Sequence, residues 1–125
     1  MHQILKAHHP VRHIKSFKYA FQGIFHALIN EPNFRIQLFA ATVSAMLGFF
    51  YKISTTEWSI LIISMGLLLM AELVNTVVEE FIDVLIKEYH EGAKVIKDMS
   101  AGFVLITAAV AAINLGLIFG PKILF

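Results

Sequence analysis

The 125-residue chain contains no cysteine and few charged side chains. The absence of cysteine excludes disulfide bonds and thiolate chemistry, and it leaves the cellular compartment undetermined from this residue type. Charged residues make up 15% of the chain, below the roughly 25% typical of soluble domains. Hydrophobic residues account for 58% and occur in long runs. The sequence therefore predicts a single integral membrane domain over residues 1–125.

Two common nucleotide-binding motifs are also missing. The sequence has no GxxxxGK[ST] motif and no glycine-rich kinase loop, so any use of a nucleotide requires a different architecture. The formal net charge of +1 identifies no partner, and no nucleic-acid partner is expected.

Three apolar segments indicate an all-α membrane protein with three transmembrane helices. The predicted spans are residues 34–51, 58–86 and 99–119. The first is short and carries small residues suited to close helix contact. The second is expected to continue beyond the bilayer as one helix. A polar connection, residues 87–98, should lead to the third span, which Gly120-Pro121 should end.

The segment before the first span has a different pattern. Residues 12–29 place apolar side chains on one helix face and polar ones on another, which predicts an amphipathic helix in the membrane interface. Asn30-Glu31-Pro32-Asn33 should end it, because Pro32 disfavours helix at the preceding residue. Residues 1–11 are expected to be a flexible leader and not a cleavable signal peptide. His8, His9 and His13 could suggest a metal-binding tail, but a hydrated, disordered leader is the favoured interpretation.

Orientation follows from the distribution of positive charge. Eight of the ten Lys and Arg residues precede the first span or lie between the second and third, and two lie on the opposite side: Lys6, Arg12, Lys15, Lys18, Arg35, Lys87, Lys94 and Lys97 against Lys52 and Lys122. The positive-inside rule then predicts a cytoplasmic N-terminus and a cytoplasmic second connection.

Polar residues enter the end of the second span as a regular stripe. Glu72, Asn75, Glu79 and Asp83 are separated by three, four and four residues, which places them within about 80° of arc on one helix face. Carboxylates at the edge of a membrane span are costly without a partner or a task. This stripe, which should open toward the cytoplasm, is therefore the predicted functional site.

Depth along the stripe suggests how its members divide the chemistry. A deep, poorly solvated carboxylate such as Glu72 is suited to act as a general base. Shallower ones such as Glu79 can bind a hard cation, and Mg²⁺ typically takes one or two carboxylates together with phosphate oxygens. Lys97 and Arg12 could neutralise a transferring phosphoryl group.

The same residues also permit other interpretations. Buried carboxylates serve proton or cation pathways, and Asn75 could be an interhelical hydrogen-bonding residue. Glu80, Glu88 and Glu91 fit solvated faces near the interface, and His90 alone would fit an interfacial histidine. The residues by themselves favour a cation-dependent membrane enzyme only slightly over a small ion-conducting oligomer.

A longer pattern separates these interpretations. Glu72-x2-Asn75-x3-Glu79-x3-Asp83 is followed by Glu88-Tyr89-His90 and Lys97-Asp98, and preceded by Ile29-Asn30-Glu31-x2-Phe34-Arg35. In order and spacing it resembles the signature of the prokaryotic diacylglycerol kinase family, over roughly residue 12 to the third span. The resemblance implies a homotrimer in the bacterial cytoplasmic (inner) membrane, which transfers the γ-phosphoryl of MgATP to a lipid hydroxyl at sites between subunits.

The resemblance also implies roles for individual residues. Glu72 matches the catalytic base and touches the lipid, and Glu31 and Glu79 match the metal ligands. Asn75 and Asp83 match supporting polar positions. The nucleotide-contacting positions are matched by Arg12, Tyr19, Glu31, Glu79, Glu88, Tyr89, His90, Lys97 and Asp98. Arg12 additionally matches a position near the lipid head.

The surface helix bears on the acceptor lipid. The stretch Ser16-Phe17-Lys18-Tyr19-Ala20-x2-Gly23-Ile24 resembles the branch that phosphorylates undecaprenol, and it lacks the Trp of the diacylglycerol-preferring pattern. Undecaprenol is therefore the favoured acceptor and diacylglycerol the alternative. A proton- or cation-handling oligomer remains the alternative from a different class.

Overall fold

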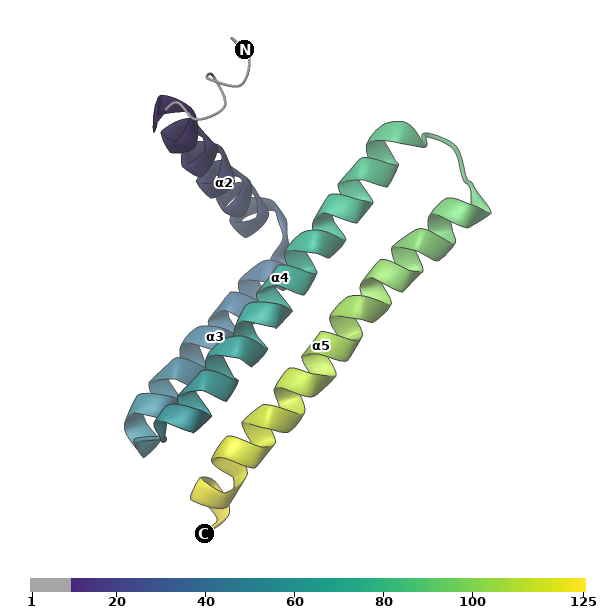
Figure 1. Cartoon of the computed structure of the whole chain (residues 1–125). Helices are drawn as coiled ribbons and strands as arrows, with labels where there is room; N and C mark the ends of the chain where they lie inside the picture. Colours follow the sequence, from purple (N-terminus) through teal and green to yellow (C-terminus); the bar gives the residue numbers. More distant parts are fainter. Residues whose placement is uncertain (1–9) are drawn as a thin grey trace. The chain divides into compact units, whose positions relative to one another are not determined.

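The structure, a computed structural model, describes residues 10–125, which form four α-helices and no strand. Helix α2 spans Pro10–Asn30, α3 Pro32–Tyr51, α4 Thr55–Leu85 and α5 Glu91–Leu124 (Figure 1). Three of them, α3, α4 and α5, are long and apolar enough to cross a membrane. The predicted all-α architecture of three spans preceded by a helix is therefore confirmed.

The chain divides into two compact units, residues 1–32 and residues 33–125. The first contains α2, whose apolar side chains at Ile14, Phe17 and Phe21 are exposed. This exposed apolar face agrees with the amphipathic pattern of the sequence. Glu31 interrupts the helices as expected, and α3 begins at Pro32, where a missing backbone N–H costs nothing. Most of the predicted leader, residues 1–9 with His8 and His9, lies outside the described residues, whereas Pro10 and Val11 open α2.

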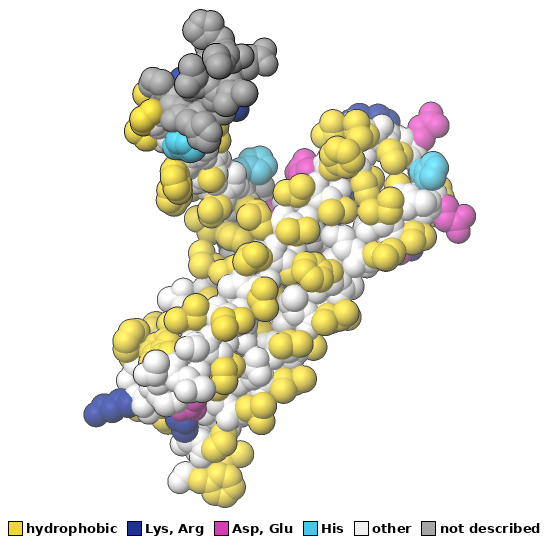
Figure 2. Space-filling view, viewed as in Figure 1, with side chains coloured by type: hydrophobic (Ala, Val, Ile, Leu, Met, Phe, Trp, Pro, Cys, Tyr) yellow, Lys and Arg dark blue, Asp and Glu magenta, His cyan; other side chains and the backbone are white. Residues whose placement is uncertain are grey.

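The second unit is held together chiefly by α4, which packs along α5. Buried apolar side chains form its core: Ile53, Leu61, Met65, Leu68, Ala111, Ile118 and Phe119. Figure 2 shows apolar side chains along these helices and charged ones gathered toward their ends. This distribution is typical of helices that cross a hydrocarbon layer.

The connection between α3 and α4 is a tight turn. Lys52 has a positive φ of 52°, and the Ile53 N–H donates to the Gly48 carbonyl. Ser54 then caps α4, because its side chain accepts from the Glu57 N–H while the Glu57 carboxylate accepts from the Ser54 N–H. These reciprocal hydrogen bonds start α4 at Thr55, three residues before the predicted start at Trp58.

The third span differs most from its predicted bounds. Helix α5 begins at Glu91 instead of Met99, because the His90 side chain caps it by accepting from the Ala93 N–H at 3.3 Å. It also continues through Pro121 to Leu124, so the predicted end at Gly120-Pro121 is wrong. The proline lies in the last turn, where its carbonyl still accepts from the Phe125 N–H and little helix follows to be broken.

Candidate active site

The polar stripe on α4 is graded by burial. Glu72 is 3% exposed and Asn75 is 8% exposed. One turn further on, Glu79 is half-buried, and Asp83 is exposed. The burial of the polar side chains on this face of α4 therefore decreases steadily, from the protein interior at Glu72 to solvent at Asp83.

Glu72, the deepest carboxylate, is held by a neighbouring helix. The Gln37 amide on α3 donates from Nε2 to Glu72 Oε2 at 3.0 Å. The Thr76 hydroxyl satisfies the Glu72 backbone carbonyl at 3.0 Å. Gln37 is a site residue that the sequence patterns did not identify. Its signal is weak, a lone amide within an otherwise apolar run.

Asn75 and Glu79 form the next level of the stripe. Asn75 Nδ2 donates to Glu79 Oε1 at 3.4 Å, whereas the buried Asn75 Oδ1 has no hydrogen-bond partner. The half-buried Glu79 carboxylate offers oxygen, the ligand atom that Mg²⁺ prefers, whereas Asn75 turns its amide nitrogen toward Glu79. Among residues 10–125, no three His, Asp or Glu side chains form a ready metal cage. Mg²⁺ nevertheless fits the oxygen ligands of this site, and phosphate oxygens would be expected to supply the remaining ligands.

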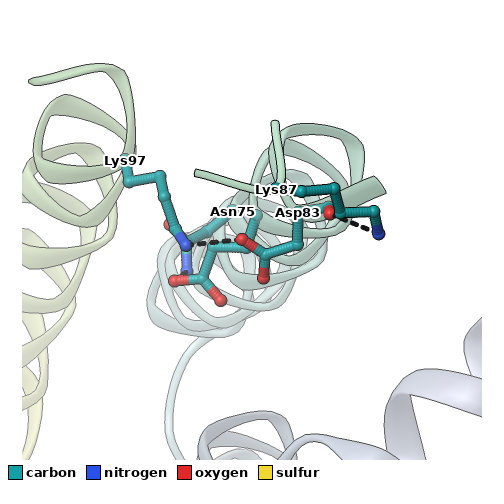
Figure 3. Close-up of polar contacts among 5 residues, drawn as sticks. Asn75, Asp83, Lys87 and Lys97 are labelled. Atoms are coloured by element: carbon teal, nitrogen blue, oxygen red, sulfur yellow. Dashed lines mark hydrogen bonds and ion pairs between the residues drawn. The ribbon is translucent and has the colours of Figure 1, made fainter. Parts of the chain in front are cut away.

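A pocket of about 320 Å³, lined by both charged and apolar side chains, lies where α4 ends and α5 begins. Lys97 on α5 reaches Asp83 on α4, with Nζ and Oδ1 2.8 Å apart (Figure 3). Lys87 Nζ donates to the Asp83 backbone carbonyl at 3.1 Å. The pocket is lined by Ile82, Asp83, Ile86, Glu88, Tyr89, His90, Ala93, Lys94, Lys97 and Asp98.

This pocket brings together residues predicted to contact nucleotide. Glu88, Tyr89, His90, Lys97 and Asp98 all line it, although two sequence segments supply them. Tyr89 is 81% exposed, so its ring is accessible to a ligand.

Two members of the pocket have structural tasks as well. His90 Nδ1 accepts from the Ala93 N–H as the cap of α5. Asp98 forms an ion pair with Lys94 one helical turn before it, with Nζ and Oδ2 2.6 Å apart. Both ions of that pair are more than half exposed, so its contribution to stability is small.

Three predicted site residues, Arg12, Tyr19 and Glu31, belong to the first unit. Arg12 and Tyr19 are exposed on α2. The Arg12 backbone carbonyl accepts from the Ser16 hydroxyl at 2.9 Å. Glu31 follows α2 directly and is half-buried, with its backbone N–H donating to Ala27 at 2.8 Å.

The sequence is similar to several characterised proteins. A diacylglycerol kinase from Synechocystis sp. (strain ATCC 27184 / PCC 6803 / Kazusa) is 33% identical, over 87% of this chain and 63% of its own length. A diacylglycerol kinase from Escherichia coli (strain K12) is 32% identical, over 82% of this chain and 84% of the relative. An undecaprenol kinase from Bacillus subtilis (strain 168) is 36% identical, over 90% of this chain and 91% of the relative.

The family model for prokaryotic diacylglycerol kinase matches residues 18–119, which include the whole α4 stripe and the pocket. Together with relatives above 30% identity over most of their length, this match establishes the chain as a lipid kinase of the prokaryotic diacylglycerol kinase family.

Proposed function

We propose that this lipid kinase transfers the γ-phosphoryl group of MgATP to the primary hydroxyl of a membrane lipid at the cytoplasmic interface. The observation that carries the proposal is the graded stripe on α4, which runs from the buried Glu72 carboxylate to Asp83 in the lining of the pocket. A lipid hydroxyl and a soluble nucleotide occupy different depths, and they could meet along such a stripe.

Glu72 is the proposed general base. Its carboxylate accepts the proton of the lipid hydroxyl as the hydroxyl oxygen forms a bond to the γ-phosphorus. The bond between that phosphorus and the bridging oxygen of ADP breaks, so the products are ADP and a lipid phosphomonoester. Phosphoryl transfer of this kind depends mainly on positioning and charge neutralisation.

The pocket at the α4–α5 junction is the proposed nucleotide site. Lys97 carries the positive charge nearest the stripe and would neutralise phosphate oxygens. Arg12 and Tyr19 would contact the nucleotide from α2, and Arg12 would also lie near the lipid head. Glu88, Tyr89, His90 and Asp98 complete the proposed set.

Glu79 and Glu31 are the proposed metal ligands, with Asn75 and Asp83 in support. Mg²⁺, when bound, would neutralise phosphate charge and orient the γ-phosphoryl group. The partly exposed Glu79 carboxylate favours the assignment of Glu79 as a ligand.

Undecaprenol is the favoured acceptor. The relative from Bacillus subtilis is named undecaprenol kinase, and the stretch from Ser16 to Ile24 on α2 resembles that branch. Diacylglycerol is the second candidate, because relatives from Synechocystis and Escherichia coli are named for it. Both lipids offer a primary hydroxyl, so the same base and metal ligands would serve either.

The proposal includes a location and an assembly. Eight of ten Lys and Arg residues lie on the side of the N-terminus and the α4–α5 junction, which favours a cytoplasmic site in the bacterial inner membrane. A homotrimer with sites between subunits follows from the family resemblance.

The test is a transfer assay with purified protein in mixed micelles and γ-labelled MgATP. Undecaprenol and a diacylglycerol are offered in parallel, with Glu72→Gln as the inactive variant. Glu80→Gln is the matched control, because Glu80 is an exposed carboxylate on the same helix outside the stripe. Label in undecaprenol, lost in Glu72→Gln and kept in Glu80→Gln, is the expected result.

Label only in diacylglycerol would reassign the acceptor. Absence of label in both lipids, together with absence of nucleotide binding, would contradict the proposal and favour the ion-pathway interpretation of the stripe.

A further inference from the structure

A side-chain hydrogen bond between Gln37 and Glu72 links α3 to the stripe. It joins residues 35 positions apart, with 3.0 Å between Gln37 Nε2 and Glu72 Oε2. Glu72 is 3% exposed, so water contributes little to holding its carboxylate in place. The orientation of Glu72 is therefore set by protein groups, and Gln37 is one of them.

The carboxylate fixes which way the Gln37 amide points. An ionised carboxylate only accepts hydrogen bonds, so the amide nitrogen has to face Glu72 and the amide oxygen has to face elsewhere. That oxygen, Oε1, is buried and has no hydrogen-bond partner. A buried acceptor without a partner destabilises the fold.

Helix packing alone does not account for glutamine at this position. An apolar side chain of similar length, such as leucine, would fill the same volume without an unpartnered oxygen. What leucine would lack is the donor to Glu72. The ability to donate a hydrogen bond to Glu72 is therefore the property that distinguishes glutamine from leucine at this position.

We propose that Gln37 is a positioning residue for the general base Glu72, an inference that rests on the proposed function. The hydrogen bond to Oε2 fixes the plane of the carboxyl group and therefore the direction in which it meets the lipid hydroxyl. Proton transfer requires the base within about 2.6–3.2 Å of the hydroxyl oxygen, so a loosely held carboxylate would be a poor base.

The first test is Gln37→Leu, assayed for kcat and for the KM of both substrates. We expect kcat to fall about tenfold or more, in line with the cost of misplacing a catalytic group, while both KM values stay within about twofold. The matched control is Asn114→Leu, which removes a different amide hydrogen bond between membrane helices, the 2.8 Å bond from Asn114 Nδ2 to Ser64 Oγ. Asn114→Leu should keep its kcat.

The second test is Gln37→Glu, which keeps the size of the side chain. Two carboxyl groups at this distance repel each other when both are ionised, so the new side chain can donate to Glu72 only while it holds a proton. Activity of Gln37→Glu should therefore fall as pH rises through a range in which the wild-type rate is maintained. This pH profile also tests the positioning role of Gln37 if the Gln37→Leu variant fails to fold.

Some results would overturn the positioning role alone. These are an unchanged kcat in Gln37→Leu, an equal loss in Asn114→Leu, or a wild-type pH profile in Gln37→Glu, each in a protein whose wild type phosphorylates lipid and whose Glu72→Gln variant does not. Absence of lipid phosphorylation by the wild type would overturn the proposed function and this inference together.

Discussion

At the scale of single residues, position along α4 gives identical side chains different surroundings. Glu72 and Glu79 are two helical turns apart, which corresponds to about 10 Å along the axis. The first is buried and the second half-exposed. One helix can therefore offer both a sheltered carboxylate for proton transfer and an accessible one for a cation.

Lys97 is the residue whose loss should affect the nucleotide most. Its ammonium bridges to Asp83 across the pocket, so Lys97→Ala removes positive charge from the proposed phosphate site. We expect kcat/KM for ATP to fall about tenfold or more. Steady-state kinetics with varied MgATP measures this. Lys87→Ala is the control, since Lys87 binds a backbone carbonyl at the same helix end and does not line the pocket.

Glu79 is the residue whose change should affect the metal. Glu79→Gln keeps the shape of the side chain but removes the charge that attracts a hard cation. The Mg²⁺ concentration for half-maximal activity should rise several-fold at saturating ATP, and Glu80→Gln should leave it unchanged. A Glu79→Gln enzyme with the wild-type Mg²⁺ titration would exclude Glu79 as a ligand.

Sequence periodicity predicts contacts within a helix better than contacts between helices. The spacing of Glu72, Asn75 and Glu79 was sufficient to place them on one face, because helix geometry is fixed. The bond from Gln37 to Glu72 could not be predicted in this way, since it depends on how α3 is aligned along α4. That alignment is set by many apolar contacts without a distinctive pattern.

At the scale of elements, the α3–α4 turn depends on Gly48. A Cβ built at this residue would lie 2.7 Å from the Trp58 ring and 3.1 Å from the Ile53 side chain. Ile53 belongs to the tight connection that ends with the Ser54 cap, and Trp58 belongs to the first turn of α4. The absence of a side chain at Gly48 therefore allows α3 and the start of α4 to approach closely.

Gly48→Ala should destabilise the protein, because the rigid indole cannot move aside without disturbing the turn. The expected loss is about 1–3 kcal/mol of unfolding free energy, as for other overpacked sites. Gly66→Ala is the control, since a Cβ there meets nothing within 4 Å of the same chain. Unfolding by denaturing detergent in micelles compares the two, and equal stability would contradict the steric account.

Helix ends were predicted less well than helix existence. Apolar runs identify the membrane-embedded part of α5, but its first turns contain Lys94, Lys97 and Asp98 and do not differ in hydropathy from a polar loop. The His90 side chain caps the helix, and α5 therefore starts at Glu91 and not at the predicted Met99. The pocket depends on this start, because it presents Lys97 toward Asp83.

At the scale of the whole molecule, charge should fix the direction of insertion. The two ends of the α3–α5 unit carry different ions: Glu57 pairs with Lys122 at 2.8 Å at one end, and the pocket occupies the other. The pocket end carries the larger number of cations and should remain cytoplasmic.

Single-cysteine labelling can measure this orientation, because the chain has no cysteine of its own. Lys87→Cys should react with a membrane-impermeant maleimide only in inverted vesicles, and Thr56→Cys only in right-side-out vesicles. Both residues are exposed, so accessibility within the protein does not limit either reaction. The opposite labelling pattern would show that the site faces away from the cytoplasm.

The lengths of α4 and α5 have a kinetic consequence. With 31 and 34 residues they extend about 46 and 51 Å, well beyond the roughly 30 Å of hydrocarbon in a bilayer. The ends of these helices would therefore lie outside the bilayer, so that ATP would reach the site from the aqueous solution and the acceptor lipid by diffusion within the membrane. The rate should then depend on the mole fraction of the acceptor lipid in the membrane and not on its bulk concentration. Adding inert lipid to the membrane should slow turnover even when the total amount of acceptor is constant.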